Sequence, residues 1–317
     1  MGTAKIIQIE KYKLEEKTML VSMKEILDRA NQENYAVAAP VVQTEFNART
    51  AIKCAEELNA PIILLVPLIF DYDVDLFGRY LKELAQSATV PVAINHDHGS
   101  DFPSAVECIR AGFSSIMVDR SELPFEENIA QVKELVKVAH AVGVSVEAEL
   151  GHVGNASNYD TDRDAALTEP ELAKKFIEET GIDCLAVAIG TAHGAYNKGQ
   201  MPYLDYERLV EIKKVTNNFP LVLHGGSGTG DEGLAKVAKM GINKVNIGCE
   251  LFASAIDAIE NADTEGNGAY GFANIIEEGY GSRLKHFIRV LDSEGKAWEV
   301  KKIIKREKVE LTEETIL

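Results

Sequence analysis

The chain has 317 residues, and 46% of them are hydrophobic, so one large domain with a sizeable core is within reach. Its formal net charge of -17 argues against nucleic acid and membranes as partners, because both attract positively charged surfaces. The sequence has no signal-peptide pattern and no apolar run of membrane-spanning length, and its four cysteines lie far apart. These features predict a cytoplasmic protein with reduced thiols.

Short apolar runs alternate with amphipathic patterns along most of the chain. Residues 1–19 are predicted to be an N-terminal extension, and a helix is predicted to begin at Ser22, which forms a capping-box pattern with Glu25. The predicted strands are 35–40, 61–66, 90–94, 114–118, 144–150, 183–189, 219–224 and 243–247. Apolar spacing of three and four predicts helices at 44–59, 124–143, 168–181, 205–217 and 230–241. Thr168 with Glu171 is another capping-box pattern, and Asp205 is a predicted N-cap.

Eight apolar strands that alternate with helices predict parallel pairing with both faces of the sheet covered. Eight such units are the number found in a (β/α)₈ TIM barrel. A doubly wound open sheet is the alternative, but no G-x-G-x-x-G follows the first strand. We therefore predict a single TIM-barrel domain over residues 1–317, with a divergent helical tail from about residue 265 to residue 317 that packs outside the barrel or on a partner subunit.

Five of the seven histidines fall at or just after predicted strand ends, where TIM barrels have their active sites. His98, His193 and His224 are each followed by glycine, which lets the backbone approach a ligand closely. Three imidazoles from different strands with an open fourth position are typical of a catalytic zinc site. The alternative is that these histidines are satisfied polar groups at strand ends. If the strand geometry continues through 96–98, His96 and His98 share one side and Asp97 the other.

Two further groups of residues are candidates for chemistry. The glycine-rich segment 225–228 follows one strand and NIGCEL follows the next, and TIM barrels often bind phosphate with these two loops. An ordinary glycine-rich turn is the alternative. Carboxylates at strand ends are Asp97, Asp119, Glu147 and Glu149, of which Asp97 adjoins a proposed ligand. For Asp119 and Glu149 an ion pair or a strand-end cap is an equal alternative.

Several motifs in order resemble one family, the class II, metal-dependent ketose-bisphosphate aldolases, which act on fructose and tagatose bisphosphates. The motifs are HDHGS (96–100), VDRSELPFEENI (118–129), SVEAELG (145–151), GIDCLAVAIGTAHGAY (181–196), LDYERLVEI (204–212), PLVLHGGSG (220–228) and INKVNIGCEL (242–251). The resemblance runs from about Ser22 to Phe252.

The resemblance implies roles for individual residues. His98, His193 and His224 would hold one catalytic Zn²⁺ per chain, and Asp97 would move the proton at the aldehyde oxygen. Asp119 and Glu149 match positions that touch a second or displaced metal. The substrate's dihydroxyacetone phosphate moiety would be surrounded by Gly194, Gly225, Ser227 and Asn246. Gly226, Gly248 and Cys249 are further candidates for phosphate binding. A monovalent cation is a further cofactor candidate, and a homodimer or homotetramer is the implied assembly.

The resemblance implies a zinc-dependent aldolase that gives dihydroxyacetone phosphate and an aldehyde from a phosphorylated ketose, such as fructose or tagatose bisphosphate or a related sugar phosphate. A metal-dependent sugar-phosphate isomerase or epimerase and a non-catalytic sugar-phosphate binder are the alternatives.

Some segments depart from the family pattern and indicate a reshaped substrate pocket. APVVQTEF (39–46) and LLVPLIF (64–70) replace polar segments, and Cys249 stands where a phosphate-contacting threonine is usual. The loop 152–165 lacks the family's glutamate and is predicted to be a mobile lid. The residues predicted as substitutes for that glutamate are Tyr159, Asp160, Asp162 and Asp164.

Overall fold

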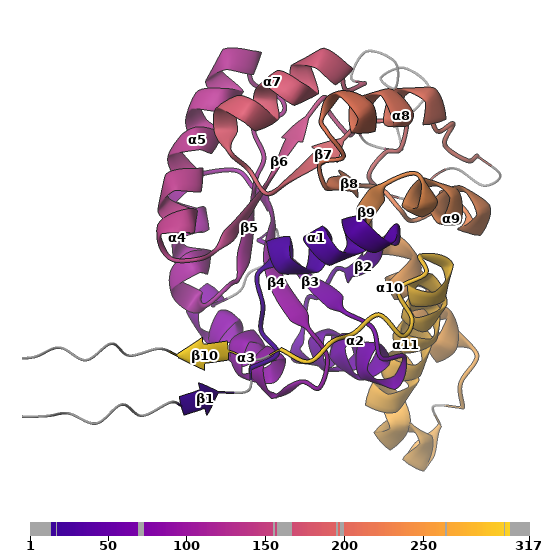
Figure 1. The fold of residues 1–317 in the computed structure, drawn as a ribbon. Coiled ribbons are helices and arrows are strands. Elements are labelled where there is room, and N and C mark those ends of the chain that lie inside the picture. Colours follow the sequence, from indigo (N-terminus) through magenta and orange to yellow (C-terminus); the bar gives the residue numbers. More distant parts are fainter. Residues whose placement is uncertain are drawn as a thin grey trace, which may run out of the picture.

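Eight parallel strands form a nearly closed barrel with helices around its outside (Figure 1), which confirms the predicted TIM-barrel fold. The computed structural model describes residues 14–16, 18–68, 73–154, 156, 167–194, 196, 200–263, 265–300 and 302–304. The barrel strands are β2 (Val37–Pro40), β3 (Ile62–Pro67), β4 (Val92–Gly99), β5 (Ser115–Val118), β6 (Ser145–Leu150), β7 (Cys184–Val187), β8 (Leu221–Leu223) and β9 (Ile242–Ile247).

The strand order is β2-β9-β8-β7-β6-β5-β4-β3, and the barrel closes where β2 meets β3. The closing contact is a parallel bridge between Val41 and Leu65, with a 2.8 Å hydrogen bond from the backbone N–H of Val42 to the carbonyl of Leu65. Since all eight strands run in the same direction, their carboxyl ends gather at one end of the barrel. Side chains that follow different strands can therefore meet there.

The helices lie outside the barrel, except that one closes its amino end. They are α1 (Met23–Glu33), α2 (Glu45–Glu57), α3 (Val74–Ser87), α4 (Phe102–Ala111), α5 (Phe125–Ala141), α7 (Pro170–Thr180), α8 (Tyr206–Val215), α9 (Asp231–Lys239), α10 (Cys249–Glu260) and α11 (Phe272–Val290). Met23, Ile26 and Leu27 of α1 pack on the cluster that fills the barrel interior, which includes Ile63 and Val222. This packing leaves the carboxyl end as the open end.

Two N-caps form where the sequence predicted them. The Ser22 side chain accepts a hydrogen bond from the backbone N–H of Glu25, and the Asp205 side chain accepts one from the N–H of Arg208. The predicted cap at Thr168 is wrong. Its hydroxyl donates to the carbonyl of Leu150 and accepts from the N–H of Ala188, so Thr168 ties the ends of two strands together instead.

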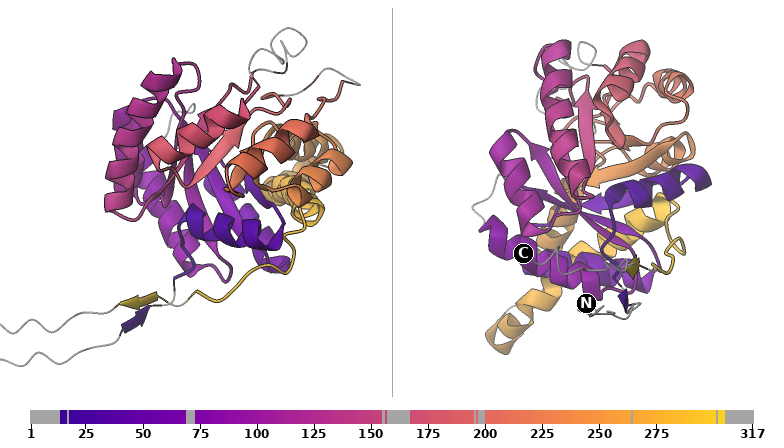
Figure 2. Two further views of the ribbon diagram at one scale, coloured as in Figure 1. Left: turned by 45° about the horizontal axis from the view of Figure 1, so that its top comes forward. Right: turned by 60° about the vertical axis from the view of Figure 1, so that its left-hand side comes forward.

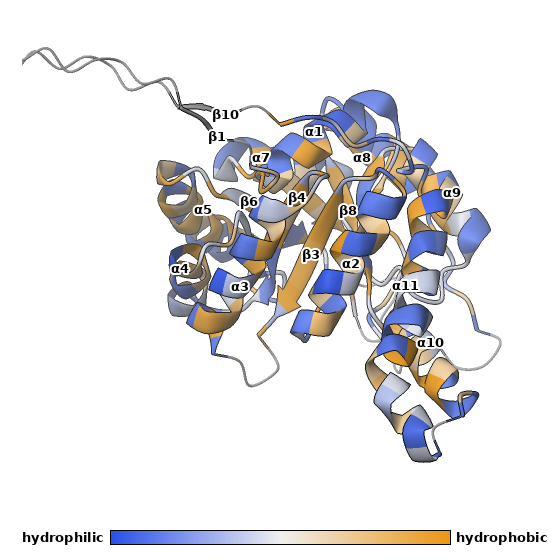
Figure 3. Cartoon of the chain, turned by 90° about the horizontal axis from the view of Figure 1, so that it is seen from below, coloured by the Kyte–Doolittle hydropathy of each residue, from blue (hydrophilic) through white to orange (hydrophobic). Residues whose placement is uncertain are grey.

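The C-terminal region packs outside the barrel, as predicted. After α10 the chain forms a short 3₁₀ helix, η3 (Gly266–Gly271), and then α11, which lies against α10 and α2. Near the termini, β1 (Leu14–Glu16) pairs antiparallel with β10 (Lys302–Ile304). Figure 3 shows apolar residues on the barrel strands and polar residues on the outward faces of the helices, and no described helix is long and apolar enough to cross a membrane.

Candidate metal centre and substrate cavity

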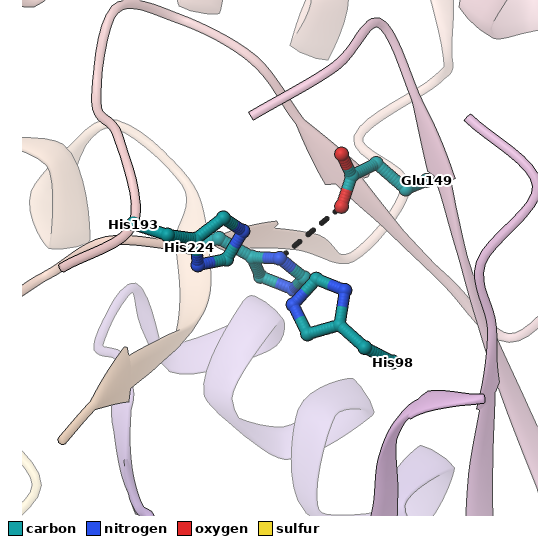
Figure 4. A group of neighbouring side chains, drawn as sticks. All are labelled: His98, Glu149, His193 and His224. Atoms are coloured by element: carbon teal, nitrogen blue, oxygen red, sulfur yellow. Dashed lines mark ion pairs between the residues drawn. The ribbon is translucent and has the colours of Figure 1, made fainter. Parts of the chain in front are cut away.

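Three histidines and a glutamate from four different strands meet at the carboxyl end of the barrel (Figure 4). They are His98 at the end of β4, Glu149 in β6, His193 after β7 and His224 after β8. One possible ligand atom from each side chain lies within 4.8 Å of all the others. The geometry therefore brings together the three histidines that the sequence selected and adds Glu149 to them.

A break in β4 allows Asp97 and His98 to line the same cavity. His98 has a φ of 50°, and the pairing of β4 with β5 shifts register between His96 and Gly99. Strand alternation therefore stops before His98, so the condition under which His96 and His98 would share a side is not met. His96 is buried away from the cavity, and burial lowers its pKa to about 4, although the nearby Asp97 opposes that shift.

Carboxylates hold two of the imidazoles in a fixed orientation. Nδ1 of His98 lies 2.7 Å from Oδ2 of Asp119, whose other oxygen accepts hydrogen bonds from the backbone N–H and hydroxyl of Ser121. Nε2 of His224 lies 2.9 Å from Oε1 of Glu147, and the other oxygen of Glu147 lies 2.5 Å from Nζ of Lys244. Each carboxylate thus takes one ring nitrogen and leaves the opposite one available as a ligand.

The contact between His224 and Glu149 tests whether this group suits a cation. Nδ1 of His224 lies 3.2 Å from Oε2 of Glu149, yet both atoms are buried and neither has a hydrogen-bond partner among the described residues. If Nε2 of His224 carries the proton and donates it to Glu147, Nδ1 of the same ring faces Oε2 of Glu149 with a lone pair on each atom. This arrangement is unfavourable unless a proton or a metal ion lies between the two atoms.

Burial and the charges of neighbouring side chains together set the protonation of the histidines. Burial lowers the pKa of His224, but Glu147 and Glu149 outweigh burial and raise it to about 10. Burial, followed by the neighbouring His224 and His98, holds the pKa of His193 far below its usual range. A neutral imidazole is the form that binds metal, and a divalent cation can replace the proton on Nδ1 of His224. The donor set of three imidazoles and a carboxylate thus fits a transition-metal ion.

Asp119 and Glu149, which the resemblance linked to a second or displaced metal, take different positions. Glu149 is part of the group that surrounds the three imidazoles, whereas Asp119 lies behind His98 and hydrogen-bonds its ring. Sequence reasoning missed Lys244, which is fully buried and pairs with Glu147. Its signal was a lysine in the middle of the otherwise uncharged strand INKVNI, where an inward-facing charge needs a partner.

A cavity of about 820 Å³ opens beside the metal centre. Its lining includes Asp97, His98, His193, Gly194, Gly225, Ser227, Asn246, Gly248 and Cys249. The side-chain amide of Asn246 lies 3.3 Å from Oδ1 of Asp97 and orients this carboxylate. Gly226 does not line the cavity. A Cβ at that position would lie 2.4 Å from the Val245 side chain, so Gly226 is required for close packing beneath the loop.

The loops after β8 and β9 meet at the N-terminus of α10, on one side of the cavity. Gly248 is the N-cap of α10 and Cys249 is its first residue. The hydroxyl of Ser227 accepts from the N–H groups of Gly248, at 3.4 Å, and Glu250, at 3.3 Å, which ties the two loops together. A helix N-terminus of this kind favours an anionic group. The loop 152–165, apart from residues 152–154 and 156, lies outside the described residues, so its predicted role as a lid stays a prediction.

Comparisons with a family profile and with a known protein both identify the same family. The profile of the family described as "Fructose-bisphosphate aldolase class-II" matches residues 21–296. A fructose-bisphosphate aldolase from Thermus caldophilus is 39% identical over 257 residues, which are 74% of this chain and 84% of that protein.

Among solved structures, the YdjI aldolase from Escherichia coli K12 has a TM-score of 0.79 at 32% identity and covers 88% of this chain and 100% of its own. A fructose-bisphosphate aldolase from Campylobacter jejuni has a TM-score of 0.74 and covers 88% of this chain and 97% of its own, but at 22% identity it supports the fold alone. By its sequence match over most of its length, this chain belongs to the class II fructose-bisphosphate aldolase family and is a lyase that acts on carbon–carbon bonds.

Proposed function

We propose that this protein is a zinc-dependent aldolase that cleaves and forms a carbon–carbon bond in a phosphorylated ketose, giving dihydroxyacetone phosphate and an aldehyde. One observation carries the proposal: the metal centre, through His98 and His193, borders the same cavity as the carboxylate of Asp97 and the N-terminus of α10. A metal centre, a proton carrier and an anion site are the three elements that such a reaction needs.

Zinc is the proposed metal, because imidazole and carboxylate ligands in a set of three or four are typical of catalytic zinc sites. His98, His193 and His224 would hold it, with Glu149 as a further candidate ligand. When bound, the metal would act as a Lewis acid that stabilises negative charge developing on the ketone fragment as the bond breaks. Asp119 and Glu147 would keep the ligating nitrogens of His98 and His224 aimed at the metal.

The remaining residues would bind the substrate and move its proton. The phosphate would lie at the N-terminus of α10, against Gly225, Ser227, Gly248 and Cys249. Asp97, oriented by Asn246, would accept the hydroxyl proton during cleavage and return it to the aldehyde oxygen during condensation.

A cytoplasmic location is proposed as well. All four cysteines are free thiols, and Cys54, Cys108 and Cys184 are buried. Unpaired thiols throughout a chain are typical of a reducing compartment.

The proposal is tested by offering the metal-loaded protein a panel of ketose monophosphates and bisphosphates and measuring dihydroxyacetone phosphate with a coupled enzyme. Release of dihydroxyacetone phosphate together with a trapped aldehyde is the expected result. A ketose that is isomerised or epimerised without aldehyde release would support the alternative function instead.

The role of Asp97 has its own test. Asp97→Asn is expected to retain its metal and to lose about two to four orders of magnitude in turnover, the usual contribution of an acid–base group. The exposed Asp75 in the first turn of α3 provides the control Asp75→Asn, which should keep parental turnover. Turnover of Asp97→Asn within a few-fold of the parent would assign Asp97 a structural role only.

A further inference from the structure

The substrate cavity has one polar side and one apolar side. The metal centre, Asp97 and the glycine-rich loops form the polar side. An apolar wall of the same cavity includes Val41, Pro67, Phe252, Ala253 and Ile256, and the uncharged Gln43 also lines the cavity. No lysine or arginine belongs to the described residues that line this cavity.

The apolar wall begins directly beside Asp97. Pro67 at the end of β3 pairs in register with Asp97 in β4. Val41 follows β2, the other neighbour of β3, and a Cβ on Gly248 would lie 3.1 Å from its side chain. Phe252 and Ile256 lie one helical turn apart on α10, so they present one face to the cavity. The wall therefore runs from Asp97 past Pro67 and Val41 to α10.

The wall is held rigidly from behind. The hydroxyl of Tyr280, a residue of α11 whose side chain is fully buried, donates a 2.8 Å hydrogen bond to the carbonyl of Val41. The ring of Phe252 packs edge-on against Tyr280 with 5.7 Å between centroids. The backbone N–H of Val41 also donates to the carbonyl of Ile247. Since these contacts come from the barrel and from α11, the wall keeps its shape without a ligand.

We infer that the aldehyde which this enzyme releases or accepts is uncharged and largely apolar, and is not phosphorylated. The inference rests on the proposed function, which puts the reacting hydroxyl at Asp97 and the phosphate of the ketone fragment at α10. In condensation, the carbon next to the ketone loses a proton and bonds to the aldehyde carbon, and the aldehyde oxygen gains a proton. The substituent on that aldehyde carbon then extends from Asp97 along Pro67 and the apolar wall.

Charge and desolvation both disfavour a second phosphate at this wall. A phosphate beyond Asp97 would approach a carboxylate, would be desolvated by Val41, Pro67 and Phe252, and would find no described cation to compensate it. An aliphatic substituent gains from burial at the same wall, and the amide of Gln43 can meet a single hydroxyl group.

Two assays separate this inference from the proposed function. Exchange of the methylene protons of dihydroxyacetone phosphate with D₂O, followed by NMR, needs no aldehyde and tests only the ketone side of the reaction, that is the metal centre, the phosphate site and the base that removes the proton. Condensation of dihydroxyacetone phosphate with propanal, glyceraldehyde or glyceraldehyde 3-phosphate then compares substituents through kcat/KM.

We expect exchange, and a kcat/KM for the uncharged aldehydes at least about tenfold above that for the phosphorylated one. Exchange with a preference for glyceraldehyde 3-phosphate would overturn the inference and leave the proposed function standing. Absence of both exchange and condensation would overturn the two together.

A positive charge introduced into the apolar wall tests the inferred aldehyde preference by changing the protein instead of the aldehyde. Ile256 is 56% exposed in the middle of α10, and Ile256→Arg adds a cation to the wall without burying it. It should shift the kcat/KM ratio of phosphorylated to uncharged aldehyde about tenfold toward the phosphorylated one. Val210, 54% exposed in the middle of α8 and outside the cavity lining, gives the matched control Val210→Arg, in which the ratio should stay unchanged. An equal shift in the two variants would show that net charge, and not the wall, sets the preference.

Discussion

At the scale of single residues, the most unusual feature is a chain of buried polar groups beneath the metal centre. Lys244, Glu147 and His224 are all fully buried and lie in series, with Glu147 between the other two. Burial of an isolated charge in a protein interior is costly, so each charge in this series depends on its neighbour. The lysine balances the glutamate, and the glutamate fixes the histidine, which connects the stability of the barrel to the orientation of a candidate metal ligand.

Removing the lysine from this series should destabilise the protein strongly. Lys244→Met removes one of the two partners of the buried Glu147 carboxylate and leaves it only His224, which is expected to lower the free energy of unfolding by up to about 3–5 kcal/mol. Urea unfolding of the metal-free proteins measures this loss. The double variant Lys244→Met/Glu147→Gln removes both charges and should recover part of the stability. A single variant as stable as the parent would show that the pair contributes nothing to folding.

The metal-binding role of His98 is tested by a pair of histidine variants. His98→Ala should lose bound metal and activity, because it removes one of three imidazole ligands. His140 also forms a 2.8 Å contact with an aspartate, Asp183, but lies away from the cavity, so His140→Ala is the control and should keep both properties. Elemental analysis of the purified variants gives the answer. Full zinc content in His98→Ala would remove this residue from the ligand set.

At the scale of elements, local patterns predicted most strands because the barrel strands contain short, mainly apolar runs buried on both sides. All eight predicted strands occur, with ends that differ from the prediction by a few residues. The helices α3 and α4 were not among the predicted helical patterns. The helix α3 does carry an apolar stripe, with Phe77 and Leu81 buried, and the sequence reading overlooked it. The buried face of α4 consists of small residues, so α4 has no stripe of large apolar side chains that could have predicted it.

The functional site, like the helices, was predicted from local sequence patterns only in part. Strand ends and glycine neighbours were enough to select His98, His193 and His224. The sharing of a cavity by Asp97 and His98 depends on a register shift between β4 and β5, and the partner of Lys244 lies 97 residues away in β6. Such relations between distant segments leave no local pattern, and only the folded barrel reveals them.

The N-terminus of α10 is the element on which phosphate binding should depend. Cys249 is exposed at its first position and offers a much weaker hydrogen bond than a threonine hydroxyl. Cys249→Thr should tighten binding of dihydroxyacetone phosphate by up to about tenfold, the scale of one modest hydrogen bond. Calorimetric titration of the metal-loaded protein measures the affinity, and Cys249→Ala serves as a control without a donor. An unchanged or weaker affinity in Cys249→Thr would place position 249 outside the phosphate site.

At the scale of the whole molecule, one region extends beyond the barrel. Figures 1 and 2 show that the segment where α10 leads through η3 into α11 projects away from the body of the protein. Its exposed side chains include Tyr270, which is 91% exposed, and Phe272, which is 50% exposed. Neighbouring aromatic side chains on a projecting segment are typical of a surface that associates with another chain.

We therefore predict that the protein is a homodimer or homotetramer in solution and that this projecting segment contributes to its interface. Replacing both aromatics by glutamate, Tyr270→Glu/Phe272→Glu, would put charges into that contact and should shift the protein toward the monomer, because unpaired charges at the centre of an interface are strongly unfavourable. Sedimentation velocity over a range of concentrations measures the change. Leu172, an exposed apolar residue of α7 (42% exposed), gives the control Leu172→Glu, which should keep the parental assembly. A parent protein that sediments as a monomer would refute the predicted assembly, and an oligomer that survives the double substitution would place the interface on another face of the barrel.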